Sequence, residues 1–451
     1  MKLDAVNQVY FVGIGGIGMS ALARYFVKRG CLVCGYDRTR TTLCAELEQE
    51  GIRISYADEV TQLPDPFQEQ GPQTLVVYTP AIPATSALLS YFKEKGFVLK
   101  KRSEVLGIIS AGQFCIAVAG THGKTTTSSM IAHILKETGF DCTAFLGGIA
   151  TNYNSNFLLG DNEVVVVEAD EYDRSFLTLH PDIAVITSMD ADHLDIYGDP
   201  SQLEDSFRLF AGQLKAEGTL IVKAGLPVES ELTYGLNSRA TINGLDIRIE
   251  EGSFLFDFIA GELSIMDIRM LLPGKHNVEN AVVAIAVALR LGIEPEAIKQ
   301  ALGNFKGVKR RFEYVVRNEQ HVYIDDYAHH PEELRACFEA VRALYPQKKL
   351  TVIFQPHLFS RTRDFADDFA SVLSTADDLL LLDIYPAREL PIEGVNAQML
   401  LNKITAPEKE VLGKEAALSS IEKKQPELLL TVGAGDIDTL ISPLKDILSH
   451  A

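Results

Sequence analysis

Short apolar runs alternate with longer amphipathic segments along most of the chain. In "QVYFVGIGGIGMSALARYFVKRG" an apolar run leads into a glycine turn and then into apolar residues at helical spacing. The runs "CLVCGYD", "TLVVYTPAIP" and "FVLKKRSEVLG" continue the alternation to about residue 108. Strands that alternate with helices are typical of a doubly wound α/β domain, so the pattern predicts one over residues 1–108.

Two further blocks repeat this alternation. The second begins at "QFCIAVAGTHGKTTT", continues through the apolar runs "EVVVVEAD", "PDIAVITSM" and "GTLIVK", and ends in a long helical pattern, "NVENAVVAIAVALRLG". The third begins near residue 320 and contains "KLTVIF", "DDLLLLDI" and "ELLLTVG". We therefore predict an α/β protein of three domains: a Rossmann-like domain (1–108), a central P-loop-type domain with a mostly parallel sheet (109–319) and a C-terminal Rossmann-like domain (320–451).

Composition narrows the possible functions. The chain has 451 residues, which is too long for one core, and a formal net charge of -19. That charge argues against broad binding to nucleic acid or to a membrane surface. No apolar run reaches the roughly 20 residues that span a bilayer, and the first residues lack a signal-peptide pattern. We predict a cytoplasmic protein, monomeric or homodimeric, with no nucleic-acid or membrane partner.

The stretch "GTHGKTTT" has the chemistry of a phosphate-binding loop. An apolar strand precedes it and a helix follows, so free backbone N–H groups and the positive helix end can face phosphate. Glycine allows close approach, Lys124 can reach the terminal phosphates and the Thr125 hydroxyl can bind Mg²⁺. The loop is shorter than the common pattern, but its strand–helix context favours nucleotide binding. The predicted nucleotide-binding residues here are Gly120, Thr121, His122, Gly123, Lys124, Thr125 and Thr126.

Acidic residues follow two other buried-type strands. "VVVVEADEYD" brings Glu168 to a strand end, and "SMDADHLDIYG" brings His193 to another. In a parallel sheet both strand ends open onto the edge that carries the phosphate loop. The sequence therefore predicts a Mg²⁺ site formed by Thr125, Glu168 and His193.

A second glycine-rich loop, "GIGGIG", lies about a hundred residues upstream. Gly13, Gly15 and Gly18 match the G-x-G-x-x-G pattern, and Asp37 lies about twenty residues further on. The loop could bind NAD, or it could hold the diphosphate of another nucleotide. The residues alone leave both readings open.

Polar motifs also occur downstream. Asn277 and Asn280 open a helix, where N-capping is an equally simple explanation. "DDYAHHP" places two carboxylates, a tyrosine and two histidines before a helix-starting proline, and capping explains one polar residue rather than five. Arg361 begins another helix and could face a carboxylate or phosphate.

Eight motifs in order resemble the Mur ligases, and the resemblance covers nearly the whole chain. They are "GIGGIGMSALA", "GTHGKTTT", "EADEYD", "DADHLD", "GKHNVENA", "RRFE", "DDYAHHP" and "QPHLFSRTRD". The resemblance implies one domain for a UDP-sugar, one for ATP, and a C-terminal domain that receives the amino acid and closes over the site. Among these ligases the chain looks closest to the type that adds L-alanine to UDP-N-acetylmuramate, in peptidoglycan precursor synthesis.

The resemblance also implies roles for individual residues. The first loop would bind the UDP diphosphate rather than NAD, and Lys124 would act on the ATP phosphates as one of three catalytic residues with His329 and Arg361. Asn277 and Asn280 would meet adenine, Asp326 the ribose and Arg311 the phosphates. Tyr327, His329 and Arg361 would line the muramoyl carboxylate and alanine end. The substrate-binding residues would thus be Gly13, Gly15, Gly16, Ile17, Gly18, Asp37, Tyr327, His329 and Arg361.

Two departures from the family pattern stand out. Leu358 occupies a position that is commonly arginine, and "IYGDPSQLEDSFRLF" has no lysine that could be carbamylated as in relatives that add later amino acids. The nearest alternative is another Mur ligase, such as the one that recycles whole tripeptide onto UDP-N-acetylmuramate. An NAD-dependent oxidoreductase would leave "GTHGKTTT" unexplained, and a P-loop protein without chemistry would show no amino-acid-dependent use of ATP.

The order of bond making follows from the same residues. A carboxylate is a poor electrophile, so ATP must activate it, either as an acyl phosphate with release of ADP or as an acyl adenylate with release of AMP. Lys124, Thr125 and the proposed metal ligands gather around the terminal phosphate, which favours the acyl phosphate. His329 is the predicted proton acceptor for the incoming ammonium group, because the pKa of an unperturbed histidine lies near neutrality.

Overall fold

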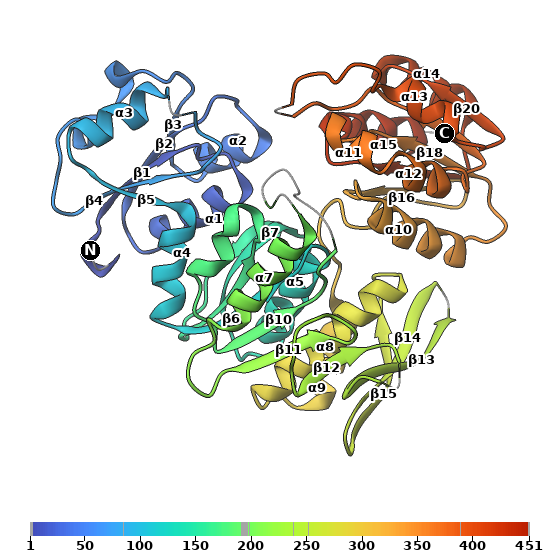
Figure 1. Cartoon of the computed structure of the whole chain (residues 1–451), viewed down its shortest axis with the longest axis horizontal. Helices are drawn as coiled ribbons and strands as arrows, with labels where there is room; N and C mark the ends of the chain where they lie inside the picture. The colour runs from blue at the N-terminus through green and yellow to red at the C-terminus, as the bar shows by residue number, and fades with distance from the viewer. Residues whose placement is uncertain are drawn as a thin grey trace. The chain divides into compact units, whose positions relative to one another are not determined.

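The computed structural model describes residues 3–83, 85–190, 197, 199–237, 239–250, 252–387 and 389–449. Three β-sheets with flanking helices follow one another along the chain (Figure 1), and this confirms the predicted α/β class. The chain separates into two compact units. Unit 1 contains Met1–Asp246, Phe256–Arg269 and Glu279–Lys306, and unit 2 contains Ile247–Leu255, Met270–Val278 and Gly307–Ala451.

The N-terminal sheet has the strand order β3-β2-β1-β4-β5, and all its pairings are parallel. Its order reverses beside β1, which is where doubly wound sheets bind nucleotides. Alternate residues of β1 enter different cores, because Val9 and Phe11 pack on one face of the sheet and Tyr10 and Val12 on the other. The strands are β1 (Gln8–Val12), β2 (Leu32–Tyr36), β3 (Arg53–Ser55), β4 (Thr74–Tyr78) and β5 (Val98–Lys101), and the helices are α1 (Ile17–Lys28), α2 (Thr42–Gln49), α3 (Ala87–Glu94) and α4 (Arg102–Ala111).

The central sheet has ten strands in the order β15-β14-β13-β12-β11-β10-β6-β9-β7-β8. Around β6 the pairing is parallel on both sides, whereas β8 is antiparallel to β7. The strands are β6 (Phe114–Ala119), β7 (Thr143–Ala150), β8 (Ser155–Leu158), β9 (Val164–Ala169), β10 (Ile183–Ile186), β11 (Thr219–Lys223), β12 (Leu232–Gly235), β13 (Ile242–Glu250), β14 (Ser253–Ala260) and β15 (Leu263–Met270). The helices are α5 (Lys124–Glu137), α7 (Pro200–Ala211), α8 (Lys275–Arg290) and α9 (Pro295–Asn304), with a 3₁₀ segment at Tyr172–Thr178.

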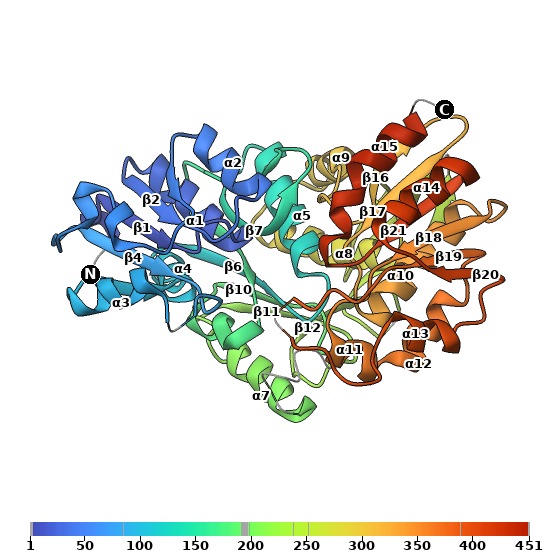
Figure 2. The same ribbon diagram turned by 90° about the horizontal axis from the view of Figure 1, so that it is seen from above.

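The C-terminal sheet has the order β16-β17-β21-β18-β19-β20, in which only the β16–β17 pair is antiparallel. Figure 2 shows α14 and α15 on one face of this sheet and α10, α12 and α13 on the other. The strands are β16 (Glu313–Arg317), β17 (Val322–Asp326), β18 (Leu350–Phe354), β19 (Asp378–Leu381), β20 (Glu408–Val411) and β21 (Leu428–Val432). The helices are α10 (Pro331–Leu344), α11 (Phe359–Asp364), α12 (Ala366–Leu373), α13 (Ala397–Lys403), α14 (Lys414–Lys424) and α15 (Ile441–Ser449).

A buried arginine fixes the helix that follows the first glycine loop. Arg24 on α1 makes an ion pair with Glu50 at 2.7 Å and donates to the side-chain oxygen of Asn156. The Asn156 amide in turn donates to Ile17 O and to the Ser20 hydroxyl. Because Ile17 is the first residue of α1, this network holds the start of the helix beside the glycine turn within unit 1.

Candidate active site

The stretch "GTHGKTTT" forms a tight loop between β6 and α5, as predicted. Gly120 has φ +138° and Gly123 has φ +83°, which are conformations that favour glycine. A Cβ on Gly120 would lie 2.1 Å from the Thr187 hydroxyl oxygen, so the backbone there also has no room for a side chain. Both glycines are therefore required by the path of the loop, and α5 begins at Lys124 directly after Gly123.

Two hydroxyl residues that follow β10, Thr187 and Ser188, form hydrogen bonds with the phosphate loop and with the end of β6. The Ser188 oxygen accepts a hydrogen bond from the His122 backbone N–H at 2.6 Å and lies 2.9 Å from the Thr121 hydroxyl. Thr187 donates to Ala119 O at 3.0 Å. Neither Thr187 nor Ser188 was predicted to have a role, although both immediately precede the "MDADHLD" stretch. They reach the loop because the parallel pairing of β10 with β6 brings the carboxyl ends of the two strands together.

Lys124 is paired with a carboxylate from the "EADEYD" motif. Its Nζ lies 2.7 Å and 3.0 Å from the two carboxylate oxygens of Glu171 and donates to Gly120 O at 2.5 Å. The Glu171 side chain is fully buried. Burial lowers the pKa of Lys124, but Glu171, Asp170 and Glu168 outweigh burial, so the pKa of Lys124 lies above its usual range. The lysine is therefore held charged at the start of α5.

Glu168 lies beside the first turn of α5, as the strand-edge argument predicts. Glu168 pairs in register with Val118 of β6, two residues before Gly120. Its carboxylate accepts from the Thr125 hydroxyl at 3.0 Å and from the Gly147 N–H at 2.9 Å. A Cβ on Gly147 would lie within 2.4 Å of the carboxylate, so this glycine, which sequence reasoning missed, is needed for the contact.

The proposed third metal ligand, His193, lies outside the described residues. Among the residues that the structure describes, no group of three or more His, Cys, Asp or Glu side chains is arranged to hold a metal ion. The neighbouring Asp190 is described: its backbone N–H donates to the Thr121 hydroxyl at 3.0 Å, and its carboxylate lies 3.6 Å from His122 Nε2.

The two asparagines predicted to meet adenine both lie in the first turns of α8. Neither is the N-cap, because the helix begins at Lys275. Asn277 is buried and its amide donates to Pro273 O at 2.6 Å. Asn280 lies against the phosphate loop, since a Cβ on Gly123 would be 2.9 Å from its side-chain oxygen.

The first glycine loop has the geometry of a nucleotide fingerprint. The backbone N–H of Gly15 donates to the Asp37 carboxylate at 2.8 Å, so the loop contacts the acid that follows β2. Gly13 has φ +92° and lies against Thr79. A Cβ on Gly18 would lie 2.6 Å from the Arg102 guanidinium. Sequence reasoning missed Arg102, a cation placed beside the first turn of α1 that lies 3.8 Å from Asp170.

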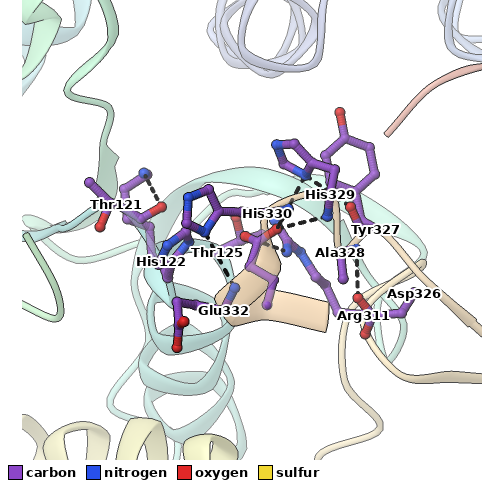
Figure 3. A network of polar contacts seen from close by, with 12 residues as sticks. Thr121, His122, Thr125, Arg311, Asp326, Tyr327, Ala328, His329, His330 and Glu332 are labelled. Atoms are coloured by element: carbon purple, nitrogen blue, oxygen red, sulfur yellow. Dashed lines mark hydrogen bonds and ion pairs between the residues drawn. The ribbon is translucent and has the colours of Figure 1, made fainter. Parts of the chain in front are cut away.

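In unit 2 the carboxyl end of β17 forms a second polar cluster, drawn in Figure 3. The Asp326 carboxylate accepts from the Phe312 N–H and the Ala328 N–H, each at 2.7 Å. Burial raises the pKa of Asp326 to about 6, and Arg311 together with these two N–H groups opposes that shift. The neighbouring Asp325 is fully buried and pairs with Arg310 at 3.0 Å.

Some residues of "DDYAHHP" start helix α10, and others remain candidates for ligand binding. Glu333 accepts from the His329 N–H at 3.0 Å, and its carboxylate lies 3.2 Å from His329 Nδ1. His330 is the N-cap of α10, and Pro331 begins that helix as predicted. The Arg311 guanidinium lies 5.2 Å from the Tyr327 ring centre, a cation–π contact. The cluster thus brings Arg311, Asp326, Tyr327 and His329 together on one edge of the sheet.

Arg361 lies on α11 and is only 8% exposed. The start of that helix is fixed by Glu389, which accepts from the Ser360 backbone N–H at 3.0 Å and from its hydroxyl. Leu358, at the position where arginine is common in the family pattern, precedes the helix with φ +70° and ψ 137°. Leucine rarely adopts this backbone conformation, so the position is strained.

Within the described part of the chain, no helix combines the length and the apolar character that a membrane span requires. Unit 1 carries the two glycine loops, Glu168 and Asn280. Unit 2 carries Asn277, Arg311, Asp326, Tyr327, His329 and Arg361.

Comparison with known proteins agrees with these motifs. Three family models match: the Mur ligase family catalytic domain over residues 8–114, the Mur ligase middle domain over residues 118–288, and the Mur ligase glutamate ligase domain over residues 310–435. Together they cover most of the chain in the order of its three sheets. This confirms the three-domain fold that the sequence predicted.

Full-length relatives are also found. The chain is 50% identical over 448 residues to the UDP-N-acetylmuramate–L-alanine ligase of Christiangramia forsetii, and 51% identical over 446 residues to that of Flavobacterium psychrophilum, with 99% of each chain covered. The crystal structure of a UDP-N-acetylmuramate-alanine ligase from Thermotoga maritima superposes with a TM-score of 0.82 at 28% identity, covering 98% of both chains. A murein peptide ligase from Psychrobacter arcticus shares the fold, with a TM-score of 0.70 at 23% identity and 98% and 99% coverage. On these grounds the chain belongs to the Mur ligase family.

Proposed function

We propose that this chain is an ATP-dependent ligase that joins L-alanine to UDP-N-acetylmuramate in peptidoglycan precursor synthesis, with release of ADP and phosphate. The observation that carries the proposal is the identity of about half of all residues, over the full length, with relatives that bear this name. It is also the activity that the motifs predicted from the sequence.

The phosphate loop supplies the activation step. Formation of an amide from a carboxylate needs prior activation, and the loop gathers its polar groups where a terminal phosphate would bind. The charged Lys124 at the start of α5 neutralises developing charge on a transferring phosphoryl group. We therefore propose that the muramoyl carboxylate becomes an acyl phosphate, and that the amine of alanine then attacks this carbonyl carbon and expels phosphate.

The residues present fit a magnesium ion. Thr125 and Glu168 offer hard oxygen donors 3.0 Å apart beside the phosphate loop, and these are the ligands that Mg²⁺ prefers. We propose that Thr125, Glu168 and His193 would hold it, where it would offset phosphate charge. Gly147 orients Glu168 for that role through its backbone N–H.

The residues of unit 2 complete the proposed assignment. Asp326 presents a carboxylate suited to ribose hydroxyls, and Arg311 a cation suited to phosphate. Tyr327, His329 and Arg361 are proposed to bind the muramoyl carboxylate and alanine end. His329 is the proposed proton acceptor, and Glu333 beside it would stabilise the imidazolium that results.

The first glycine loop with Asp37 is proposed to hold the UDP diphosphate, and Asn277 with Asn280 the adenine.

The proposed domain roles follow the predicted boundaries: UDP-sugar in residues 1–108, ATP in 109–319, and alanine in 320–451. The C-terminal domain is proposed to close on the substrates, which would exclude water from the reactive acyl phosphate. A cytoplasmic location and a monomeric or homodimeric state belong to the same proposal.

The test is phosphate release with UDP-N-acetylmuramate, MgATP and each amino acid in turn. Alanine should give the highest kcat/KM, and the product should be the alanyl conjugate. Tripeptide in place of alanine tests the recycling alternative, and NAD binding tests the oxidoreductase. If the muramoyl carboxylate carries heavy oxygen, one turnover should place label in inorganic phosphate with ADP as co-product. Label in AMP would contradict the acyl phosphate.

A further inference from the structure

Glu171 has no role in the chemistry described so far, yet it makes the closest charged contact of the phosphate-loop lysine. Both of its carboxylate oxygens lie within 3.0 Å of Lys124 Nζ, and its side chain has no exposed surface. A buried carboxylate destabilises the folded state unless it is paired with a cation. This contact therefore compensates the charge of Glu171 as well as restraining Lys124. A phosphate that binds Lys124 must therefore share or displace Glu171.

The position of Glu171 is fixed from its backbone. The Tyr197 hydroxyl donates to Glu171 O at 2.6 Å, and the Arg174 N–H donates to the same oxygen at 2.9 Å. Tyr197 is itself buried. The backbone of Glu171 is thus anchored just after β9, and its buried carboxylate is placed beside Lys124.

The charges around the loop are mainly negative. Glu171 contacts Lys124, the first residue of α5, and Glu168 contacts Thr125, the second. Asp170 has a cation of its own, because Arg102 lies 3.8 Å from it. An anionic nucleotide that approaches without a metal ion meets a lysine whose charge is already matched by Glu171.

We propose that Glu171 acts as a charge gate for the phosphate loop. Its carboxylate offsets the positive charge of the protonated Lys124, so that free nucleotide binds poorly and the magnesium complex of the nucleotide binds well. The divalent cation, held by Thr125 and Glu168, would add positive charge beside the loop, so that phosphate binding would no longer depend on Lys124 alone. Glu171 is then a positioning residue for Lys124. The inference rests on the proposed nucleotide binding by this loop, and it goes beyond that proposal because the sequence assigned Glu171 no role.

The experiment measures the Kd of ADP by calorimetry, with magnesium and with a chelator, in the absence of the other substrates. The unaltered chain should bind Mg–ADP at least tenfold more tightly than metal-free ADP. Glu171→Gln should tighten the binding of metal-free ADP about tenfold, equivalent to about 1.4 kcal/mol, and change that of Mg–ADP less than threefold. Glu137→Gln, at the other end of α5, is the matched control and should change neither value.

Two more variants separate charge from structure. Glu171→Met removes the same charge with a side chain of similar length, and it should show the same tightening if the glutamine variant does not fold. Glu171→Asp keeps the charge and should bind metal-free ADP no more tightly than the unaltered chain. The gate is refuted if folded neutral variants bind metal-free ADP unchanged or more weakly. It is also refuted if the unaltered chain binds both forms of ADP equally. Failure to bind Mg–ADP at all would instead refute the proposed function of the loop.

Discussion

The Thr125 hydroxyl donates to the Glu168 carboxylate across 3.0 Å, which joins the first turn of α5 to the end of β9. Forty-three residues separate them in sequence, and the parallel pairing of β6 with β9 brings them together. The two oxygen groups that we propose as magnesium ligands thus lie together beside the phosphate loop. The first prediction tests that arrangement.

Replacing Glu168 should weaken magnesium binding specifically. Glu168→Gln keeps the shape of the side chain and one acceptor oxygen, but it removes the charge that a divalent cation requires. We expect the magnesium concentration for half-maximal turnover to rise about 10- to 100-fold. Glu163→Gln, just before the other end of β9, is the control and should leave the magnesium titration unchanged. An unchanged titration in Glu168→Gln would remove this residue from the metal site.

Replacing Lys124 should abolish turnover while sparing the first glycine loop. Lys124→Ala should lower kcat about 10²- to 10³-fold or more, because the charge that stabilises the transferring phosphoryl group is lost. The dissociation constant of UDP-N-acetylmuramate should change little, since the predicted UDP site lies in the N-terminal domain. Because Glu171 would be left unpaired, Lys124→Ala/Glu171→Ala serves as a second variant that avoids a buried lone charge. Near-normal turnover in either variant would contradict the assignment of the loop.

Replacing Arg361 should raise the KM for substrate. A charge-assisted hydrogen bond to a carboxylate contributes about 1.5–3 kcal/mol, so Arg361→Ala should raise KM roughly 10- to 100-fold. Arg361→Lys keeps the charge and guards against a folding defect. Arg363→Ala is the matched control, because Arg363 lies on the same helix, is half-exposed and pairs with Asp364 at 2.7 Å. Equal effects of the two alanine variants would exclude Arg361 from the substrate site.

The ionisation of Asp326 should leave a signature in the pH dependence of stability. Its pKa is about 6 in the folded protein because of burial, above the value of 3.8 for an unperturbed carboxyl. Between these values the folded state binds more protons than the unfolded state. The stability contribution of this group therefore increases as pH falls from about 6 to about 4, and it is lowest above pH 6.

Comparison with Asp326→Asn isolates this effect. We expect the melting temperature of the variant, minus that of the unaltered chain, to become lower by a few degrees as the pH is lowered from 7 to 4.5. Asp436 is the opposite case: burial alone would raise its pKa, but Lys414 and Gln355 outweigh burial and lower it. Its contribution is present above the unfolded pKa and is lost at lower pH, so Asp436→Asn should show a difference of opposite sign. No pH dependence in the Asp326→Asn difference would contradict the raised pKa.

Local patterns determined much of this protein. The strand–glycine–helix order determined both glycine loops, because a loop that turns between a strand and a helix needs glycine where φ is positive, as at Gly13, Gly120 and Gly123. Pro331 marked the start of α10, since proline fits the first turn of a helix. The order of motifs along the chain also predicted the family and the three domains, since each motif is a contiguous stretch.

Tertiary structure decided which side chains meet. "EADEYD" offers several acids, and the register that pairs Glu168 with Val118, together with the turn after β9, selects Glu168 for Thr125 and Glu171 for Lys124. Gly147 lies on β7 and Ser188 follows β10, so no local pattern indicated their contacts with Glu168 and with the loop. Contacts between distant segments depend on sheet order and register, and these are settled only when the hydrophobic faces of the strands and helices pack together.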